Sequence, residues 1–424
     1  MIKPHGSDKL NPLYVRDKAE RERLLKEAES LPSIVVSSAA AANVVMLGSG
    51  YFNPLIGFMN RADALAVAGK MITTNGLFWP VPIVNVVKDA SAIKVAATKW
   101  TPEQSGMISM DIITAATAGA RRIALRDPNV EGNPVIAIQT ISAIEEFTPD
   151  EMELMTEKIF RTKDPQHPGV AAFNSAGRTV ISGPIKVLSF SYFESEFPET
   201  FRTAYQIREE MERMGWKKVV AFQTRNPMHR AHEELCRMAQ EQLKADGILI
   251  HMLLGKLKAG DIPADVRDAA IRVMVEKYFP PKTVLISGYG FDMLYAGPRE
   301  AVLHAIFRQN TGCTHLIVGR DHAGVGSYYG PFDAQTIFHQ EVPKGALAIE
   351  IFEADHTAWS KKQNRVVMMR DVPDHKPEDF VMLSGTKVRA MLAAGETLPV
   401  EFSRPEVAKI LMDFYRSERG KNAR

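Results

Sequence analysis

Two histidines lie three residues apart near the middle of the 424-residue chain, in the segment 216–234, WKKVVAFQTRNPMHRAHEE. Residues at this spacing share one face of a helix, so His229 and His232 would face the same ligand. Arg225, just before them, can hold a tetrahedral oxyanion through two N–H groups. An H-x-x-H pattern alone is more simply explained by a capped helix with two surface histidines. The neighbouring polar residues favour an anion site instead, and they are Gln223, Thr224, Arg225 and Asn226.

The same stretch predicts the elements that position these side chains. Residues 218–222 form a short apolar run with β-branched residues, which is typical of a parallel strand covered on both faces. We expect the strand to end at Gln223, with Asn226 as a helix N-cap, Pro227 as the first helical residue and helix from Met228 onward. A helix that opens directly after a strand offers free N–H groups to an anion.

A second polar turn, GRDHAG at residues 319–324, follows another predicted strand. Gly319 and Gly324 would let the backbone approach a ligand closely, Arg320 and His322 would supply side-chain donors, and Ala323 offers only its backbone. Taken alone, this string fits a surface turn equally well.

The loop 253–267 between the two motifs is either a solvated loop or a segment in which Asp261 orders a metal-bound water or a neighbouring cation. Its charged residues of interest are Lys256, Lys258, Asp261 and Arg267.

Helices and strands alternate from residue 200 onward, which predicts a parallel sheet with right-handed crossovers. Both polar turns follow strands of this sheet, so both should open at its carboxyl edge, where ligands bind in open α/β folds. The predicted strands are 218–222, 248–254, 283–287 and 314–318, and the predicted helices are 200–214, one that ends at Leu243, 264–278 and 299–310.

The length of this α/β multidomain chain predicts about three domains, and we place them at residues 1–168, 169–330 and 331–424. The first part has short apolar runs broken by Gly, Pro and Asn, which predicts a β-rich domain. The Pro- and Gly-rich stretch 164–183 is typical of a domain junction, so we place the boundary near Pro168. The elements expected in the first part are strands 34–36, 80–87, 93–96, 122–125 and 135–138 and helices 18–30 and 62–71.

The last part should contain a helix at 332–341 and a strand at 346–352, then two further helix starts. The first start is at Ser384. The second is at Ser403, where Glu406 completes a capping-box pattern.

Charge and composition limit the classes of partner. The 52 basic and 50 acidic residues leave a net charge of +2, so no cationic field points to nucleic acid or an anionic membrane. The sequence shows no apolar signal segment and no run of about 18 apolar residues, which predicts a cytoplasmic protein. Cys236 and Cys313 are too few and too distant for a disulfide framework. The absence of a G-x-x-x-x-G-K-[ST] pattern excludes a P-loop ATPase or a fused P-loop kinase.

The strings QTRNPMHRAHEEL and GRDHAG together resemble the ATP sulfurylase (sulfate adenylyltransferase) family, bacterial monofunctional type. The resemblance covers most of the chain through PHGSDKL, YFNPLIGFM, LFWPVPIV, LLGKLKAGDIPADVR, AGPREA and LSGTKVR. It implies a PUA-like N-terminal domain, a Rossmann-like nucleotidyltransferase domain and a small C-terminal α/β domain.

The resemblance also implies the reaction. The adenylyl group of MgATP would pass to sulfate, giving adenosine 5′-phosphosulfate and pyrophosphate, or the reverse reaction would make ATP. Carried over by position, sulfate would be held by Gln223, Arg225 and Ala323. ATP would be held by Gln223, Thr224, Arg225, Asn226, Gly319, Arg320, Asp321, His322 and Val366. The catalytic residues would be Thr224, Arg225, Asn226, His229 and His232. The family further implies Mg²⁺ as MgATP and a homo-oligomer, with a dimer favoured.

One departure concerns zinc, which several bacterial relatives bind through cysteines and a histidine in the C-terminal region. Here Ser360, Gln363 and Val372 occupy the cysteine positions, so we expect no structural zinc. Two alternative functions remain open, a nucleotidyltransferase that acts on a phosphoester acceptor and a non-catalytic protein that binds nucleotide or RNA.

Overall fold

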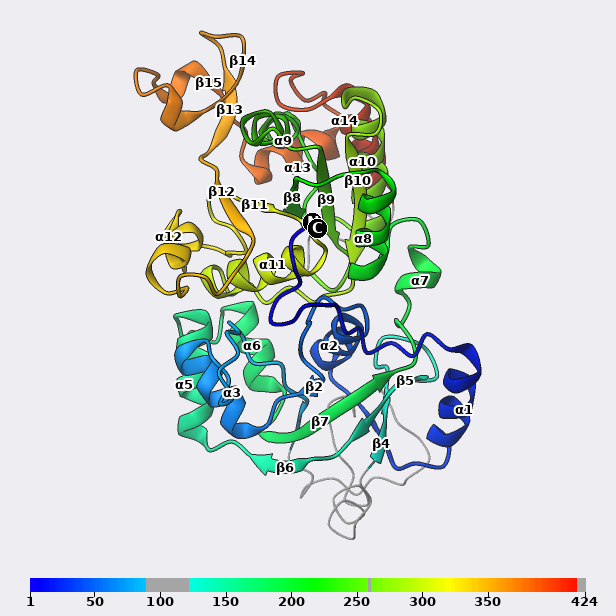
Figure 1. Cartoon of the computed structure of the whole chain (residues 1–424). Helices are drawn as coiled ribbons and strands as arrows, with labels where there is room; N and C mark the ends of the chain where they lie inside the picture. Colours follow the sequence, from blue (N-terminus) through cyan, green and yellow to red (C-terminus); the bar gives the residue numbers. More distant parts are fainter. Residues whose placement is uncertain (89–121, 258–260, 418–424) are drawn as a thin grey trace.

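The computed structural model describes residues 1–88, 122–257 and 261–417, which form two lobes seen one above the other in Figure 1. The strand expected at 93–96 and Lys258 lie outside the described residues. Every helix in the described ranges is too short or too polar to cross a bilayer.

A seven-stranded sheet organises the lower, N-terminal lobe, with the order β1-β4-β5-β7-β2 and with β3 and β6 also paired to β7. The long strand β7 (Thr179–Val187) contains Gly183, whose φ is 136° and where an added Cβ would lie 2.0 Å from the Thr140 carbonyl oxygen. Only glycine fits there. The other strands are β1 (Ser33–Val35), β2 (Gly57–Phe58), β3 (Val86–Val87), β4 (Arg122–Arg126), β5 (Val135–Thr140) and β6 (Ala143–Glu146).

Strand β7 corrects the expected junction at 164–183. The end of this stretch, which includes Gly183, looks like a linker in the sequence but lies inside β7, so the first sheet extends to residue 187, beyond Pro168. The expected strand 80–87 forms only at Val86–Val87, because Pro80 and Pro82 have no N–H for a ladder. Helices cover this sheet, and they are α1 (Lys18–Ala28), α2 (Ser38–Gly48), α3 (Arg61–Lys70), α5 (Pro149–Phe160) and α6 (Pro168–Ser175).

The upper lobe contains a five-stranded sheet with the order β10-β9-β8-β11-β12, and every pair in it is parallel. The predicted parallel sheet is therefore confirmed. The chain leaves β8 in one direction through β9 to β10 and then returns to place β11 on the opposite side of β8. Its strands are β8 (Val219–Thr224), β9 (Gly247–Leu253), β10 (Val284–Tyr289), β11 (His315–Val318) and β12 (Glu350–Glu353).

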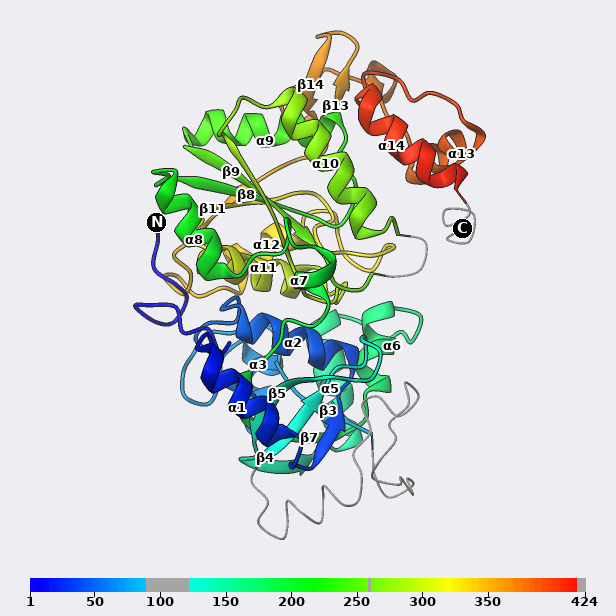
Figure 2. The ribbon, with the colours of Figure 1, turned by 90° about the vertical axis from the view of Figure 1, so that its right-hand side faces the viewer.

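Helices pack on both faces of this sheet (Figure 2). Val220 and Phe222 of β8 join a core with residues of α9 and α10, while Val219 and Ala221 join a core with residues of α8 and α11. The alternation follows from the two-residue period of a strand. The helices are α8 (Ala204–Arg213), α9 (Arg230–Leu243), α10 (Ala264–Tyr278), α11 (Pro298–Asn310) and α12 (Asp333–Gln340), after the short α7 (Phe193–Glu196).

We expected the C-terminal segment to begin at residue 331. It begins later, because β12 still belongs to the five-stranded sheet. Beyond it lie a three-stranded sheet of β13 (Thr357–Ser360), β14 (Arg365–Met368) and β15 (Phe380–Val381) and the helices α13 (Gly385–Ala394) and α14 (Pro405–Arg416). Ser384 caps α13 as predicted. The predicted capping box at Ser403 is wrong, because α14 starts one residue later, with Arg404 as N-cap and Pro405 at the favoured first position.

Helix α11 lies between the two lobes, and all of its residues are buried. Arg299 on this helix donates to the carbonyl oxygens of Pro80 at 2.9 Å and Ala68 at 2.9 Å in the lower lobe. The buried guanidinium of Arg299 thus connects α11, which packs against the upper sheet, to the end of α3 in the lower lobe.

Candidate active site

The two polar turns meet at the carboxyl edge of the upper sheet. One follows β8 and the other follows β11, and these neighbouring strands flank the point where the strand order changes direction. Ligands bind at this point in open α/β sheets. Arg225 joins the turns directly, because its Nη2 donates to the Gly324 carbonyl oxygen at 2.8 Å.

The first turn is closed by Thr224. Its hydroxyl donates to the Asn226 carbonyl oxygen at 2.7 Å and accepts from the Asn226 N–H at 3.1 Å. These bonds hold residues 224–226 in a turn, so the expected N-cap at Asn226 and helix from Met228 are wrong. Helix α9 begins at Arg230, and His229 is its N-cap.

The two histidines lie against each other at this helix start, with ring centroids 4.0 Å apart. The His229 N–H donates to Nδ1 of His232 at 3.4 Å. His229 also stacks on Phe402, with ring centroids 4.7 Å apart. Burial lowers the pKa of His232 to about 4 and lowers the pKa of His229 well below its ordinary value. Both imidazoles are therefore neutral at pH 7 without ligand.

One guanidinium nitrogen of Arg225 is available to a ligand. Its Nη1 is buried without a hydrogen-bond partner in the described part of the chain, and its guanidinium carbon lies 4.9 Å from the centre of the Tyr295 ring. A buried N–H without a partner costs free energy unless a ligand accepts from it. Nε2 of Gln223 donates to the Tyr289 hydroxyl at a long 3.4 Å.

In the second turn, residues 319–324, the backbone φ is positive at residues other than the two glycines. Asp321 and Ala323 have φ of 54° and 55°, so the left-handed conformation falls on a polar residue and a small one. A Cβ added to Gly319 would meet nothing within 4 Å, which leaves open space beside the backbone. His322 points back into the protein, where its Nε2 lies 2.9 Å from Nδ1 of His304.

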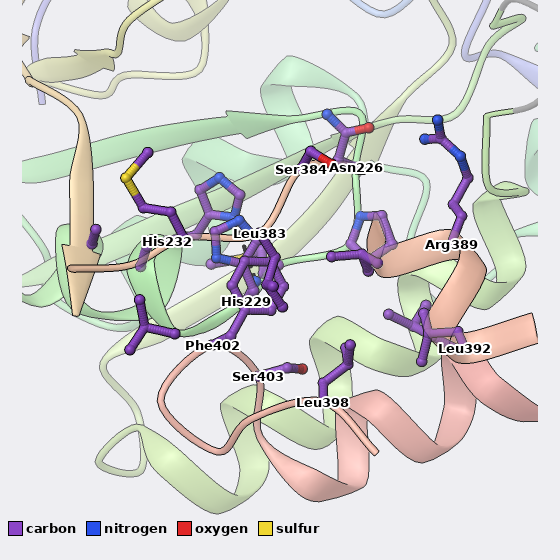
Figure 3. A pocket seen from close by; sticks show the side chains of 18 of the residues that line it. Asn226, His229, His232, Leu383, Ser384, Arg389, Leu392, Leu398, Phe402 and Ser403 are labelled. Atoms are coloured by element: carbon purple, nitrogen blue, oxygen red, sulfur yellow. Dashed lines mark hydrogen bonds between the residues drawn. The ribbon is translucent and has the colours of Figure 1, made fainter. Parts of the chain in front are cut away.

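A cavity of 690 Å³ opens beside the start of α9 (Figure 3). It is lined by Asn226, His229 and His232 from the first turn and by residues of the C-terminal segment that include His356, Ser384 and Arg389. No pattern in the sequence indicated His356, which is an isolated histidine before β13. Arg389 lies one turn into α13, where it resembles any surface cation of a helix.

The loop between the motifs divides into structural and site-facing residues. Arg267 is buried, and it donates to the carbonyl oxygens of Ile262 at 2.9 Å and Leu253 at 2.8 Å. It therefore fastens the loop. The backbone N–H of Lys256 donates to the Asp292 carboxylate at 2.8 Å, while Asp261 lines the cavity.

Comparison with known proteins agrees with this geometry. The model of the ATP-sulfurylase family matches residues 198–414, and that of the PUA-like domain matches residues 2–101 and 108–190. The chain belongs to the ATP-sulfurylase family. Proteins named sulfate adenylyltransferase from Alcanivorax borkumensis and Allochromatium vinosum are 66% and 64% identical over 417 residues, which is 98% of this chain and 98% and 99% of theirs.

A solved structure titled hexameric APS kinase from Thiobacillus denitrificans superposes with a TM-score of 0.70 over 99% of this chain and 69% of that one, at 23% identity. The predicted PUA-like and nucleotidyltransferase fold is thus confirmed.

The resemblance to ATP sulfurylases led to two further expectations, one about Val366 and one about zinc. Val366 is buried on β14 opposite Trp359 and is absent from the described residues that line the cavity. At the positions where some ATP sulfurylases have zinc ligands, Ser360 Oγ lies 2.8 Å from Nε2 of His375 and accepts from the Gln363 N–H at 3.0 Å, with Val372 buried nearby. In the described ranges, no group of three or more His, Cys, Asp or Glu side chains could hold a metal ion.

Proposed function

We propose that the chain is a sulfate adenylyltransferase, which transfers the adenylyl group of ATP to sulfate or runs the reverse reaction. The observation that carries this proposal is the meeting of two donor-rich turns at the switch point of a parallel sheet, joined by Arg225. The relatives that match over nearly the whole chain have this activity in their names.

The reaction brings two anions together. A sulfate oxygen attacks the α-phosphorus, the bond from that phosphorus to the bridging oxygen breaks, and pyrophosphate leaves with the electron pair of that bond. Such a transfer depends on fixed positive charge and on donors placed where charge develops. Mg²⁺ enters bound to the triphosphate of ATP and is part of the substrate.

We assign sulfate to Gln223, Arg225 and the backbone of Ala323. Arg225 supports this assignment because its Nη1 is buried without a partner in the described residues, while its Nη2 holds the Gly324 carbonyl oxygen. One guanidinium can thus bind an oxyanion and fix the second turn at the same time.

We assign ATP to residues 223–226 and 319–322, with Val366 near the adenine. Thr224 shapes the first turn in this proposal, because its hydroxyl is already bonded to the backbone of Asn226. His232 accepts the His229 N–H at Nδ1, so a neutral ring carries its proton on Nε2 and can donate to a phosphate oxygen. Together, His229 and His232 would stabilise charge on the α-phosphate or on the leaving pyrophosphate.

The remaining expectations belong to the same proposal. We infer a cytoplasmic homo-oligomer, with a dimer favoured, without structural zinc and without a nucleic acid or membrane partner. Light scattering of the purified protein measures the oligomer. Metal analysis of protein prepared without chelator tests the zinc prediction, which one zinc per chain would contradict.

Exchange of labelled pyrophosphate into ATP tests the function itself. The protein is incubated with MgATP and labelled pyrophosphate together with sulfate, a phosphate ester, or no acceptor. We expect label in ATP only with sulfate. Exchange only with the ester would indicate a phosphoester nucleotidyltransferase, and no exchange despite ATP binding would indicate a binding protein.

A further inference from the structure

Two side chains of α11 lie directly behind the second turn and form a chain with His322. Nε2 of His322 lies 2.9 Å from Nδ1 of His304, and Nε2 of His304 lies 3.6 Å from Oε1 of Glu300. Glu300 and His304 are one helical turn apart, and both side chains are fully buried. His304 Nε2 is among the buried nitrogens without a hydrogen-bond partner in the described residues.

The surroundings of Glu300 set the direction of the hydrogen bonds. Oε1 accepts from the Leu294 N–H at 3.1 Å and Oε2 accepts from the Ala296 N–H at 3.0 Å. The negative charge of this carboxylate favours the proton of His304 on Nε2, the ring nitrogen that faces Oε1 across 3.6 Å. Nδ1 of His304 then accepts from Nε2–H of His322, which leaves Nδ1 of His322 without a proton.

We propose that Glu300 and His304 are positioning residues that let His322 take up one proton when the anionic nucleotide binds, an inference that rests on the proposed function for its ligand. A proton from solvent binds to Nδ1 of His322. The proton on Nε2 of His322 moves to Nδ1 of His304 along their 2.9 Å contact. The proton on Nε2 of His304 moves to Oε1 of Glu300 when these two atoms close from 3.6 Å to hydrogen-bond distance. One proton enters, none leaves, and His322 then presents an N–H donor at Nδ1 while its ring stays neutral.

Other charged groups around the relay explain why the ligand is needed. Burial is the main reason why the pKa of His304 and of His322 lies well below the ordinary value. The positive charges of Arg308 on α11 and of Arg225 in the first turn lower both pKa values further. Neither ring is therefore a cation before an anion arrives.

The other end of the relay can hold the proton at neutral pH. Burial raises the pKa of Glu300 to about 7, against the opposing effects of its backbone donors and Arg225. His167 and Tyr329 also face Glu300 from other elements, and burial rather than Glu300 is the main cause of their own pKa shifts.

Calorimetric titration with α,β-methylene-ATP and Mg²⁺ at pH 8, in two buffers of different ionisation enthalpy, counts the protons. We expect the wild-type protein to take up about one proton per chain on binding and Glu300→Gln to take up almost none. His304→Asn breaks the middle of the relay and should behave like Glu300→Gln. Asp292→Asn is the matched control, because burial also raises the pKa of Asp292, which lies outside the relay, and its proton uptake should equal that of wild type.

Equal proton uptake in Glu300→Gln and wild type, or no uptake in wild type, would overturn the relay. A second measurement does not depend on the folding of any variant. In wild-type protein with ¹⁵N-labelled histidine, the His322 ring should change from the Nε2–H to the Nδ1–H tautomer when the analogue is added, and an unchanged tautomer would also overturn the relay. The proton count and the His322 tautomer are both measured on binding, without turnover. Absence of sulfate-dependent exchange would therefore refute the proposed function without contradicting the relay.

Discussion

At the scale of single residues, Arg225 has two roles in the proposed mechanism, to bind sulfate and to hold the second turn. Arg225→Ala removes both the free Nη1 and the bond to Gly324. We expect the KM for sulfate to rise roughly ten- to a hundredfold, as for loss of a charged hydrogen bond, with a smaller change in affinity for an ATP analogue. Arg225→Lys keeps the positive charge but lacks the two parallel N–H donors of the guanidinium. Its KM for sulfate should therefore lie between those of Arg225→Ala and wild type. Loss of ATP affinity with an unchanged KM for sulfate would show that the ligand assignment is reversed.

His232 tests the role of the histidine pair. In His232→Asn the side-chain oxygen can still accept the His229 N–H, but the donor at Nε2 is lost. We expect kcat and kcat/KM to fall together by about a hundredfold, as for loss of one donor to a transition state, with KM little changed. The melting temperature is measured on the same preparation. A variant with normal kcat and a lower melting temperature would assign the pair a purely structural role.

At the scale of elements, one ion pair fastens the C-terminal segment over the cavity. Arg404, the N-cap of α14, donates to both carboxylate oxygens of Glu233 at 2.9 and 2.7 Å, and Glu233 is fully buried on α9. Arg404→Ala leaves this buried carboxylate with Arg237 at 3.2 Å as the remaining partner. We expect the free energy of unfolding to fall by about 2 kcal/mol and the KM for ATP to rise, because α13 helps to line the cavity.

Urea denaturation and hydrogen exchange of residues 384–416 measure this effect. Lys409→Ala is the control on the same helix, since its pair with Asp413 is exposed and should contribute less than about 1 kcal/mol. Equal effects of the two substitutions would contradict a specific role for the Arg404 pair.

At the scale of the whole molecule, buried neutral histidines make the fold sensitive to acid. Burial lowers the pKa of nine histidines in the described ranges, among them His229, His232, His251, His304 and His322. The unfolded chain binds these protons at a higher pH than the folded chain. Stability from each histidine is therefore complete above its unfolded pKa of 6.5 and is lost as pH falls toward its folded pKa.

His232, with a folded pKa of about 4, should account for about 2 kcal/mol of stability lost between pH 7.5 and 5.0. Chemical denaturation at the two pH values should show a smaller loss in His232→Gln than in wild type. Glu300 has the opposite sign, because its folded pKa of about 7 is raised and its contribution is lost as pH rises. Glu300→Gln should therefore show a larger loss in acid. Parallel pH profiles for all three proteins would contradict this assignment.

Local patterns in the sequence determined much of the upper lobe. The helix at 264–278 forms with the predicted bounds, and the strand predicted at 218–222 forms as Val219–Thr224. Apolar periodicity and β-branched residues act over one element, so they can be read without tertiary contacts. The alternation of helix and strand also placed both polar turns at one sheet edge, since parallel strands end on the same side.

Tertiary contacts decided the rest. Helix α2 has buried residues along almost its whole length, so it lacks the polar face that marks a surface helix. Strand β7 contains glycine and proline that a local rule assigns to a linker, yet it pairs with four strands. Glu300, His304 and His322 come together because α11 packs beneath β11, and no spacing in the sequence shows that the three side chains align. The sequence determined the residue types and the short-range elements, whereas the proton relay, the start of α9 and the residues that line the cavity depend on packing between segments far apart in the chain.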